Sequence, residues 1–325
     1  MSSLSVTRNK AHGFDVVQVN TGTLSLALMP ELGGKISSLR DLRTGREWLW
    51  RNPRLPYQRV PHGGSYVTKA DTGGWDECFP SVAPCEYPSP PWAGAAIQDH
   101  GELWSQAARL EMEEGDDGVR LRTRWQGVAL PYTFERSVNL KANSARLRFE
   151  YSVTNHADAP LQFIWCAHPL LGIEPGMQLR LPSAARFNRW ATLPPALITQ
   201  DSGLSYPLTV RYDARDLDLT TLPDASAGVA LKLWSDPLHE GWATLRARDG
   251  EFRMRWDVAQ LPQVAVWMNL GAWAGDGGMP YFNLGLEPCI GAQDSLAEAV
   301  AGRKPFETLP PRGSRAWWLE VELAA

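Results

Sequence analysis

Two apolar stretches of the sequence each lead to a side chain that can accept or donate a proton. The run FIWCA precedes His168, and the run FNLGL precedes Glu287; proline follows both residues. We expect both side chains at the ends of buried strands. Partial desolvation in such a place raises the pKa of a carboxyl group and makes it a better base near neutral pH. The pair therefore indicates general acid–base chemistry.

The same residues also have a structural interpretation. A lone histidine beside a strand is more often a hydrogen-bonded structural residue, and a glutamate before proline is more often a solvated strand end. A third candidate, His100, lies between Asp99 and Glu102 in the segment QDHGELW. Its ring could bind a loop carbonyl group or form part of an acid–base pair, and the residues alone leave both alternatives open.

The common metal and nucleotide motifs are missing from the sequence. It has no HxH, HExxH or CxxC spacing, and zinc requires three or four convergent nitrogen or sulfur ligands. It also has no GxSxG elbow, glycine-rich phosphate loop or kinase signature. The cysteines are scattered as Cys78, Cys85, Cys166 and Cys289, and we expect them to be reduced. We therefore expect chemistry without a metal ion or another cofactor.

The segments that must position these side chains alternate between apolar and polar residues, which is typical of strands with one buried face. The alternating segments are residues 24–28, 119–125, 146–153, 252–258 and 317–323. Turn sequences such as EEGDDG and RDG separate them, as in antiparallel meanders. Only residues 294–302 have a helical pattern. The prediction is an all-β fold, a large two-sheet β-sandwich with few short helices, in a single domain over residues 1–325.

Composition limits the classes of partner. Hydrophobic residues make up 44 % of the chain and charged residues 21 %, which is enough to bury a large core. The net charge of −4 and the lack of a basic block argue against a nucleic-acid partner. Residues 1–15 lack the apolar run of a secretory signal, and no stretch approaches the ~20 apolar residues of a membrane helix. We expect a cytoplasmic protein with no membrane partner, and a homodimer is left open.

The order of several motifs resembles the aldose 1-epimerase, or galactose mutarotase-like, family. The motifs are PELGGKISSLRD with TGREWLW, then DHGELW, AHPLLG, LGLEPCIGAQDSL and LPPRGSRAWWLEVEL. The resemblance extends from about residue 20 to residue 323. The resemblance implies a large β-sandwich with a groove across one sheet. It also implies a cofactor-free interconversion of the α and β anomers of an aldose, with Glu287 as general base, His168 as general acid and His100 as a supporting residue.

The sequence departs from this family at two positions that hold sugar hydroxyl groups. Family members carry an Asn-Arg pair before the first histidine, where this chain has GGWDECFP. Asp76 and Glu77 in that segment are candidates to bind hydroxyl groups instead. Asp224 and Asp236 lie in the region of the family's aspartate. We therefore expect a small carbohydrate, either a free sugar or a sugar derivative, without assuming that it is galactose.

Tryptophan is unusually frequent, with 15 residues. Large rings fill protein cores more often than they bind ligands. Tryptophans that do not fill the core indicate a ligand with a flat apolar face, and sugars are the commonest ligands of this kind. Trp75, Trp92, Trp104 and Trp267 are the candidates for stacking, because they lie in or near the motifs.

Two other functions are consistent with the same residues. A non-catalytic sugar-binding or sensing protein could share the fold, because fold does not determine function. Such a protein would keep the tryptophans but need not keep His168 together with Glu287. A glycan lyase or hydrolase on a related sandwich is the other alternative. Hydrolysis normally needs two carboxylates across the bond, and the sequence offers only one strong candidate.

Overall fold

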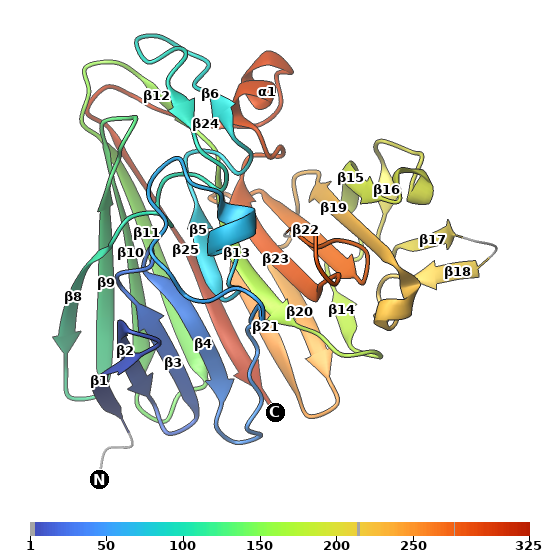
Figure 1. The fold of residues 1–325 in the computed structure, drawn as a ribbon, viewed down its shortest axis with the longest axis horizontal. Helices are drawn as coiled ribbons and strands as arrows, with labels where there is room; N and C mark the ends of the chain where they lie inside the picture. The colour runs from blue at the N-terminus through green and yellow to red at the C-terminus, as the bar shows by residue number, and fades with distance from the viewer. Residues whose placement is uncertain (1–3, 213–214, 276) are drawn as a thin grey trace.

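Antiparallel strands dominate the backbone of the computed structural model, which describes residues 4–212, 215–275 and 277–325 (Figure 1). Each of the five alternating segments is a strand, as predicted. They are β3 (Leu24–Met29), β9 (Gly118–Gln126), β11 (Arg146–Asn155), β21 (Gly250–Trp256) and β25 (Ser314–Ala324). In β9, β11 and β21 the apolar members of the alternation are buried and the polar members are more exposed. The two turn sequences lie at the β8–β9 and β20–β21 hairpins.

The larger of the two main sheets has eleven strands. In spatial order they are β1 (Ser5–Ala11), β2 (Phe14–Asn20), β3, β4 (Lys35–Asp41), β5 (Trp75–Cys78), β13 (Trp165–Gly172), β23 (Phe282–Ile290), β22 (Gln263–Leu270), β19 (Val229–Ser235), β15 (Arg186–Leu193) and β16 (Leu204–Ser205). The central strands β5, β13 and β23 are buried on both faces. This explains why the sequence around His168 and Glu287 is apolar without alternation.

The second main sheet has eight strands and packs face to face on the first. In spatial order they are β14 (Gln178–Arg180), β20 (Trp242–Ala247), β21, β25, β11, β10 (Tyr132–Lys141), β9 and β8 (Arg109–Glu114). Its outer face carries charged residues, whereas its inner face contributes apolar side chains to one core shared with the larger sheet. The prediction of a large two-sheet β-sandwich is therefore confirmed.

The remaining elements are short. The paired strands are β6 (Cys85–Glu86) with β7 (Ala96–Ile97), β12 (Leu161–Phe163) with β24 (Glu307–Leu309), and β17 (Thr209–Tyr212) with β18 (Arg215–Asp218). The helical segments are the π-helix η1 (Tyr66–Ala70), the 3-10 turns η2 (Pro195–Leu197) and η3 (Ala225–Ala227), and the α-helix α1 (Leu296–Ala301). Within the described ranges, none of these helices has the length and apolar character needed to cross a membrane.

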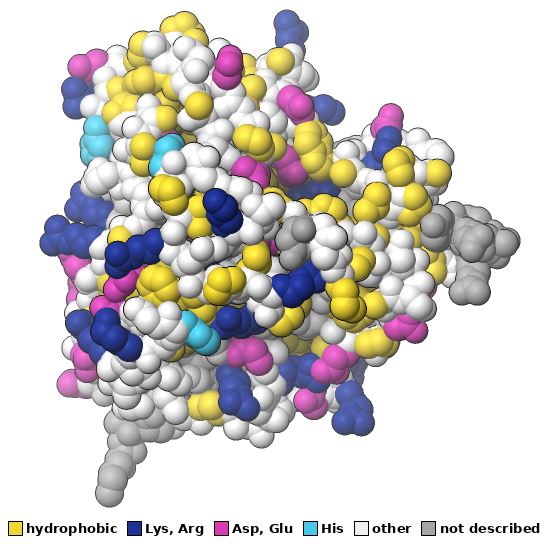
Figure 2. Space-filling model, in the orientation of Figure 1, with side chains coloured by type: hydrophobic (Ala, Val, Ile, Leu, Met, Phe, Trp, Pro, Cys, Tyr) yellow, Lys and Arg dark blue, Asp and Glu magenta, His cyan; other side chains and the backbone are white. Residues whose placement is uncertain are grey.

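The predicted helix at residues 294–302 is α1. Its first turn is capped by the Ser295 hydroxyl group, which accepts a hydrogen bond from the Glu298 backbone N–H at 3.3 Å, and the helix ends before Gly302. In Figure 1, α1 lies at one end of the sandwich beside β6, whereas β17 and β18 project at its side. Figure 2 shows Lys and Arg side chains scattered among acidic and uncharged residues on this face of the molecule.

Aromatic rings hold the two sheets together. Trp75 of β5 stacks on Phe149 of β11 with ring centroids 4.5 Å apart. Trp165 of β13 contacts Tyr151 and Trp317 of the opposite sheet at 4.8 and 5.0 Å. Offset or tilted ring pairs at such distances add about 0.5–1.5 kcal/mol each beyond their apolar burial. Core packing therefore accounts for several of the 15 tryptophans.

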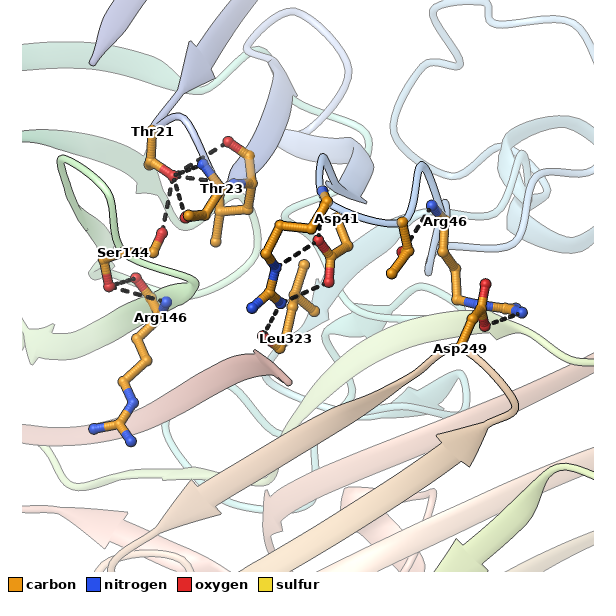
Figure 3. Close-up of polar contacts among 11 residues, drawn as sticks. Thr21, Thr23, Asp41, Arg46, Ser144, Arg146, Asp249 and Leu323 are labelled. Atoms are coloured by element: carbon orange, nitrogen blue, oxygen red, sulfur yellow. Dashed lines mark hydrogen bonds and ion pairs between the residues drawn. The ribbon is translucent and has the colours of Figure 1, made fainter. Parts of the chain in front are cut away.

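Polar contacts join loops of the two sheets at one end of the sandwich (Figure 3). The Thr21 hydroxyl group, after β2, donates to the Ser144 carbonyl oxygen between β10 and β11 at 2.8 Å. Arg46, after β4, donates to the Asp249 carboxylate at the β20–β21 turn at 2.6 Å. These contacts link loops of the larger sheet to turns of the smaller sheet and so fix how the two sheets stack.

An ion pair lies inside the core between the sheets. Arg136 of β10 donates to the Glu77 carboxylate at 3.2 Å, and both side chains are almost completely buried. Tyr151 and Trp165 donate to the same carboxylate at 3.1 Å each. Burial raises the pKa of Glu77 to about 7, although Arg136 and these hydrogen bonds act to lower it. The pair is therefore a structural feature of the core.

Arg136→Met is expected to lower the free energy of unfolding by about 3–5 kcal/mol at pH 8, because it leaves a buried carboxylate without its cation. The loss should shrink below pH 7, where Glu77 takes up a proton. Urea unfolding followed by tryptophan fluorescence measures both effects. Arg124→Met, on the exposed face of β9, should change the stability by no more than about 0.5 kcal/mol. Equal effects of the two variants would contradict the structural role of the pair.

Candidate active site

A cavity of about 240 Å³ lies on the face of the larger sheet that points away from the core, over β13, β23, β22 and β19. Its ionisable and amide side chains are Asp71, Asp99, His100, His168, Lys232, Asn283, Glu287 and Asp294. Its aromatic side chains are Tyr66, Trp190, Trp267, Trp273 and Tyr281. In Figure 1 these strands lie side by side at the centre of the molecule, and η1 is the short blue coil in front of them.

Strand alternation in β13 directs His168 into the cavity. Trp165 and Ala167 face the core, so His168 faces the opposite side of the sheet, where it pairs with Asp76 of β5. The ring is buried, and its Nδ1 has no hydrogen-bond partner among the described residues. Burial, followed by the charges of His100 and Lys232, lowers the pKa of His168 well below its ordinary value. The imidazole is therefore uncharged at neutral pH.

A tight loop brings His100 against His168. His100 has a φ of 59°, and the next residue, Gly101, has a φ of 74° with no room for a Cβ beside the Phe79 backbone. The His100 ring stacks on Tyr66 at 4.0 Å and lies perpendicular to His168 at 5.0 Å between ring centroids. This geometry makes His100 part of the cavity wall.

The charge state of His100 differs from that of His168. Its Nδ1 lies 3.0 Å from the Asp99 carboxylate. Burial acts to lower the pKa of His100, but the charge and hydrogen bond of Asp99 outweigh it, so the pKa is raised above its ordinary value. The pKa values of the two histidines are therefore shifted in opposite directions, and His100 takes up a proton more readily than His168.

Glu287 of β23 is completely buried and lies against Lys232 of β19. The Lys232 ammonium group contacts Oε2, to which the Cys166 thiol also donates at 3.2 Å. Burial acts to lower the pKa of Lys232, but the Glu287 charge outweighs it and raises that pKa. The other carboxylate oxygen, Oε1, has no hydrogen-bond partner among the described residues. One oxygen of Glu287 is thus anchored and the other is available.

Several buried polar atoms around this cavity have no hydrogen-bond partner within residues 4–212, 215–275 and 277–325. They are His168 Nδ1, Glu287 Oε1, Asp71 Oδ1, Asp294 Oδ1, and both Nδ2 and Oδ1 of Asn283. Unsatisfied buried polar atoms are rare in folded proteins because each costs free energy. Several of them around one cavity indicate that a polar ligand completes their hydrogen bonds.

The floor between Asn283 and Glu287 is bare backbone. Both side chains project from the same face of β23, with Gly285 between them. A Cβ at Gly285 would lie 2.6 Å from Glu287 Oε1 and 3.1 Å from the Cβ of Trp267 on β22. Glycine at this position therefore leaves space for the carboxylate and for a ligand.

Aromatic rings form one wall of the cavity. Trp267 and Trp273 meet edge to face at 5.6 Å, and Trp273 and Tyr281 meet edge to face at 5.4 Å. An apolar wall beside polar groups suits a ring with one hydrophobic face and several hydroxyl groups.

The structure places four of the eight site residues expected from the sequence on this cavity: His100, His168, Glu287 and Trp267. Asp76 and Trp104 lie instead on a neighbouring pocket of about 460 Å³. Asp76 contacts Lys35 and accepts a hydrogen bond from Tyr66, and the indole N–H of Trp104 donates to the Asp99 carbonyl oxygen.

The structure corrects the expectation for Trp75 and Glu77. Both alternate with Asp76 along β5 and point into the core, where they contact Phe149 and Arg136. Neither can reach a ligand in the cavity. Trp92 packs beside Tyr87 at 6.0 Å, away from the residues that line the cavity.

Asp224 and Asp236 also have other partners. Asp224 caps η3 through the Ser226 backbone N–H, and Asp236 accepts a hydrogen bond from Asn188 on the exposed surface. The aspartates that line the cavity are Asp71, Asp99 and Asp294. The cavity therefore contains more carboxyl groups than the single strong candidate expected from the sequence.

Sequence reasoning also missed Lys232 and Asn283. A lone lysine in the apolar strand VALKLWS was a usable signal, because a charge is rarely buried in a strand without a partner. Asn283 could have been found because it precedes Glu287 by four positions in the same strand, and alternation places both side chains on one face.

The cysteines form no disulfide bonds among the described residues, as expected. All four cysteines are free, and Cys78, Cys166 and Cys289 are buried. In the described part of the chain, no three His, Cys, Asp or Glu side chains converge as a metal ion would require. The absence of a cofactor stays a prediction.

Comparisons with known proteins give structural matches only. The sequence matches no protein-family model and no curated protein. A proposed aldose 1-epimerase from Klebsiella pneumoniae superposes with a TM-score of 0.72 and 17 % identity, over 100 % of this chain and 84 % of that one. A galactose mutarotase-like protein from Clostridium acetobutylicum has a TM-score of 0.68 and 13 % identity, with 99 % and 98 % covered.

A further galactose mutarotase-like protein, from Lactobacillus casei, superposes with a TM-score of 0.63 and 16 % identity, over 95 % of this chain and 99 % of that one. These structural matches cover nearly the whole chain, and the sequence motifs are likewise distributed along most of it. The chain therefore has the galactose mutarotase-like fold that its motifs resemble.

Proposed function

We propose that the protein interconverts the α and β anomers of a free aldose by acid–base ring opening in this cavity. The observation that carries the proposal is that a carboxylate oxygen, Glu287 Oε1, and an imidazole nitrogen, His168 Nδ1, line one cavity and have no hydrogen-bond partner in the described part of the chain. A base and an acid are the two groups that this reaction needs. The similarity to proteins named for mutarotation supports the same reaction.

Glu287 acts as the general base. Oε1 accepts the proton of the C1 hydroxyl group, while Lys232 holds Oε2 and balances the carboxylate charge. The electron pair of the C1 O–H bond forms the C1 carbonyl group, and the bond between C1 and the ring oxygen breaks. Rotation about C1–C2 and reversal of the proton transfers then close the ring as the other anomer.

His168 acts as the general acid. It donates a proton to the ring oxygen as that oxygen gains charge, from the opposite side of the anomeric centre. Because His168 is mostly uncharged at neutral pH, the donor is its minor protonated form, which the low pKa makes a strong acid. His100, with its raised pKa and its ring 5.0 Å away, supports the developing charge. Each positioned proton transfer contributes about 10²–10⁴-fold to the rate.

The remaining cavity residues hold the sugar. Asn283 offers one donor and one acceptor, which suits the hydroxyl groups of a carbohydrate. Trp267 stands across the glycine floor and offers an apolar face for stacking. These contacts position C1 and the ring oxygen between base and acid.

Gly285→Ala is expected to lower the rate of anomer exchange by about 10²-fold, because the new Cβ displaces the Glu287 carboxylate and displacements near 1 Å carry such costs. Gly115→Ala lies in a surface turn with no contact closer than 3.8 Å and should leave the rate unchanged. NMR exchange spectroscopy between anomer signals measures the rates. A wild-type rate in Gly285→Ala would contradict the position assigned to the base.

A non-catalytic sugar-binding protein is the main alternative, and it would use the same aromatic wall. The two functions differ in whether a bound sugar exchanges between its anomers faster than it does in buffer. An aldose panel studied by NMR exchange spectroscopy and by calorimetry should give exchange for the sugars that bind. Binding of several aldoses without exchange above the buffer rate would favour the binding protein.

A further inference from the structure

The cavity has more carboxyl groups than cationic side chains to pair with them. Asp99 pairs with His100, and Glu287 pairs with Lys232. His168 is uncharged at neutral pH because its pKa is low. Two carboxyl groups of the lining, those of Asp71 and Asp294, have no ion-pair partner within contact distance among the described residues.

Asp71 is the more deeply buried of these two residues. It directly follows η1, its exposed fraction is 5 %, and its Oδ1 has no hydrogen-bond partner among the described residues. The charged groups that act on it are Lys35 and Asp76, which contact each other, and His100, which is paired with Asp99. Burial, opposed by Lys35 and His100 and aided by Asp76, raises the pKa of Asp71 to about 6. At pH 7.5 it is therefore an anion that lacks a cation of its own.

Aromatic rings line the same cavity as Asp71, among them Tyr66, Trp273 and Tyr281. The Asn52 amide group donates to both the Asp71 carbonyl oxygen and the Tyr281 hydroxyl group, each at 3.0 Å. Tyr281 in turn contacts Trp273, which lines the same cavity. A carboxylate and aromatic faces that line one cavity are a combination that proteins use to bind an ammonium group.

We infer that the cavity takes an aldose that carries an amino group, and that Asp71 binds its ammonium. The inference rests on the proposed function, because it names the class of sugar that undergoes anomer exchange. The same charge distribution disfavours sugar phosphates and uronic acids, whose anions would approach two uncompensated carboxylates.

The test compares three classes of sugar with the wild-type protein at pH 7.5. Amino aldoses with the amino group at C2, C3 or C6 are each compared with the hydroxyl parent sugar, and glucuronate represents the anionic class. Calorimetry gives the affinity, and NMR exchange spectroscopy gives the rate between anomers. At least one amino aldose should bind about tenfold or more tightly than its parent, since hydrogen bonds to charged groups have about this value. Glucuronate should bind most weakly.

Two matched variants identify the carboxylate. Asp71→Asn keeps the size of the side chain and should reduce the preference for the amino aldose to about one. Asp294→Asn removes the same charge on the side of the cavity where Lys232 acts, and it should retain most of the preference. Asp116→Asn, in an exposed turn, controls for the change in net charge and should behave as the wild type.

The outcomes separate this inference from the proposed function. Exchange of neutral aldoses without any preference for an amino aldose would overturn the inference and leave the proposed function intact. Loss of the preference in Asp294→Asn but not in Asp71→Asn would overturn the assignment of Asp71. Failure of every sugar to exchange would overturn the proposed function itself. Since the wild-type preference is measured without a variant, the inference stays testable even if Asp71→Asn does not fold.

Discussion

Glu287→Gln is expected to lower the rate of anomer exchange by about 10²–10⁴-fold while sugar binding stays nearly unchanged. Glutamine has the size of glutamate and keeps most of its hydrogen bonds, but it cannot accept the C1 hydroxyl proton. NMR exchange spectroscopy at equal protein concentration gives the rate, and calorimetry gives the affinity. Exchange at the wild-type rate in this variant would defeat the mechanism.

The Glu287 substitution also affects the fold, because Lys232 then lies buried without its anion. A cost of about 3–5 kcal/mol is usual for a buried pair that loses one partner. The double variant Glu287→Gln/Lys232→Met removes both charges and should recover much of that stability. It should not recover exchange. Recovery of exchange together with stability would show that the single variant failed through misfolding.

His168→Asn is expected to lower the exchange rate by about 10²–10⁴-fold, again with little loss of binding. Asparagine can donate a hydrogen bond to the ring oxygen but cannot transfer a proton under these conditions. The measurement is the same pair of exchange and affinity experiments. An equal loss of affinity and of rate would instead indicate that His168 only holds the sugar.

His100→Asn should harm both quantities. His100 lies in the cavity wall beside His168, and its pKa is raised whereas that of His168 is lowered. Its loss should therefore weaken binding as well as the stabilisation of charge in the transition state. A variant with a normal affinity and a normal rate would remove His100 from the site.

Strands with one exposed face were predictable from the sequence. In β9, Val119 and Leu121 are buried, and they alternate with arginines that the outer face accepts. The period of two alone identifies such a strand and the face that it buries. The helix α1 was predictable for a similar local reason, because a capping serine and a terminal glycine enclose a short helical pattern.

The orientation of side chains in the central strands was not predictable. All four residues of β5 are buried, so the sequence WDEC has no alternation to show which face meets the core. The choice of Trp75 and Glu77 as ligand contacts was therefore a choice of the wrong face. Asp76 points away from the core, but it lies toward the neighbouring pocket.

The cavity carboxylates depend on tertiary structure. Asp71 follows η1 and Asp294 precedes α1, and the two lie far apart in the sequence. Only the folding of these two loops over the larger sheet brings them to one cavity. His168 and Glu287 were easier to find, because each interrupts an apolar run and matches a motif of the family that the sequence resembles. The expectation that they lie at strand ends was wrong, since both lie within their strands, β13 (Trp165–Gly172) and β23 (Phe282–Ile290).

The most direct test of the account starts from a single pure anomer of an aldose and follows its optical rotation in buffer with EDTA. The account predicts that the wild-type protein accelerates the approach to equilibrium above the buffer rate, in proportion to protein concentration and without an added metal ion. The sugars tested should include an amino aldose and its hydroxyl parent. Tight binding with no acceleration for any sugar, or acceleration that appears only after a divalent ion is restored, would contradict it.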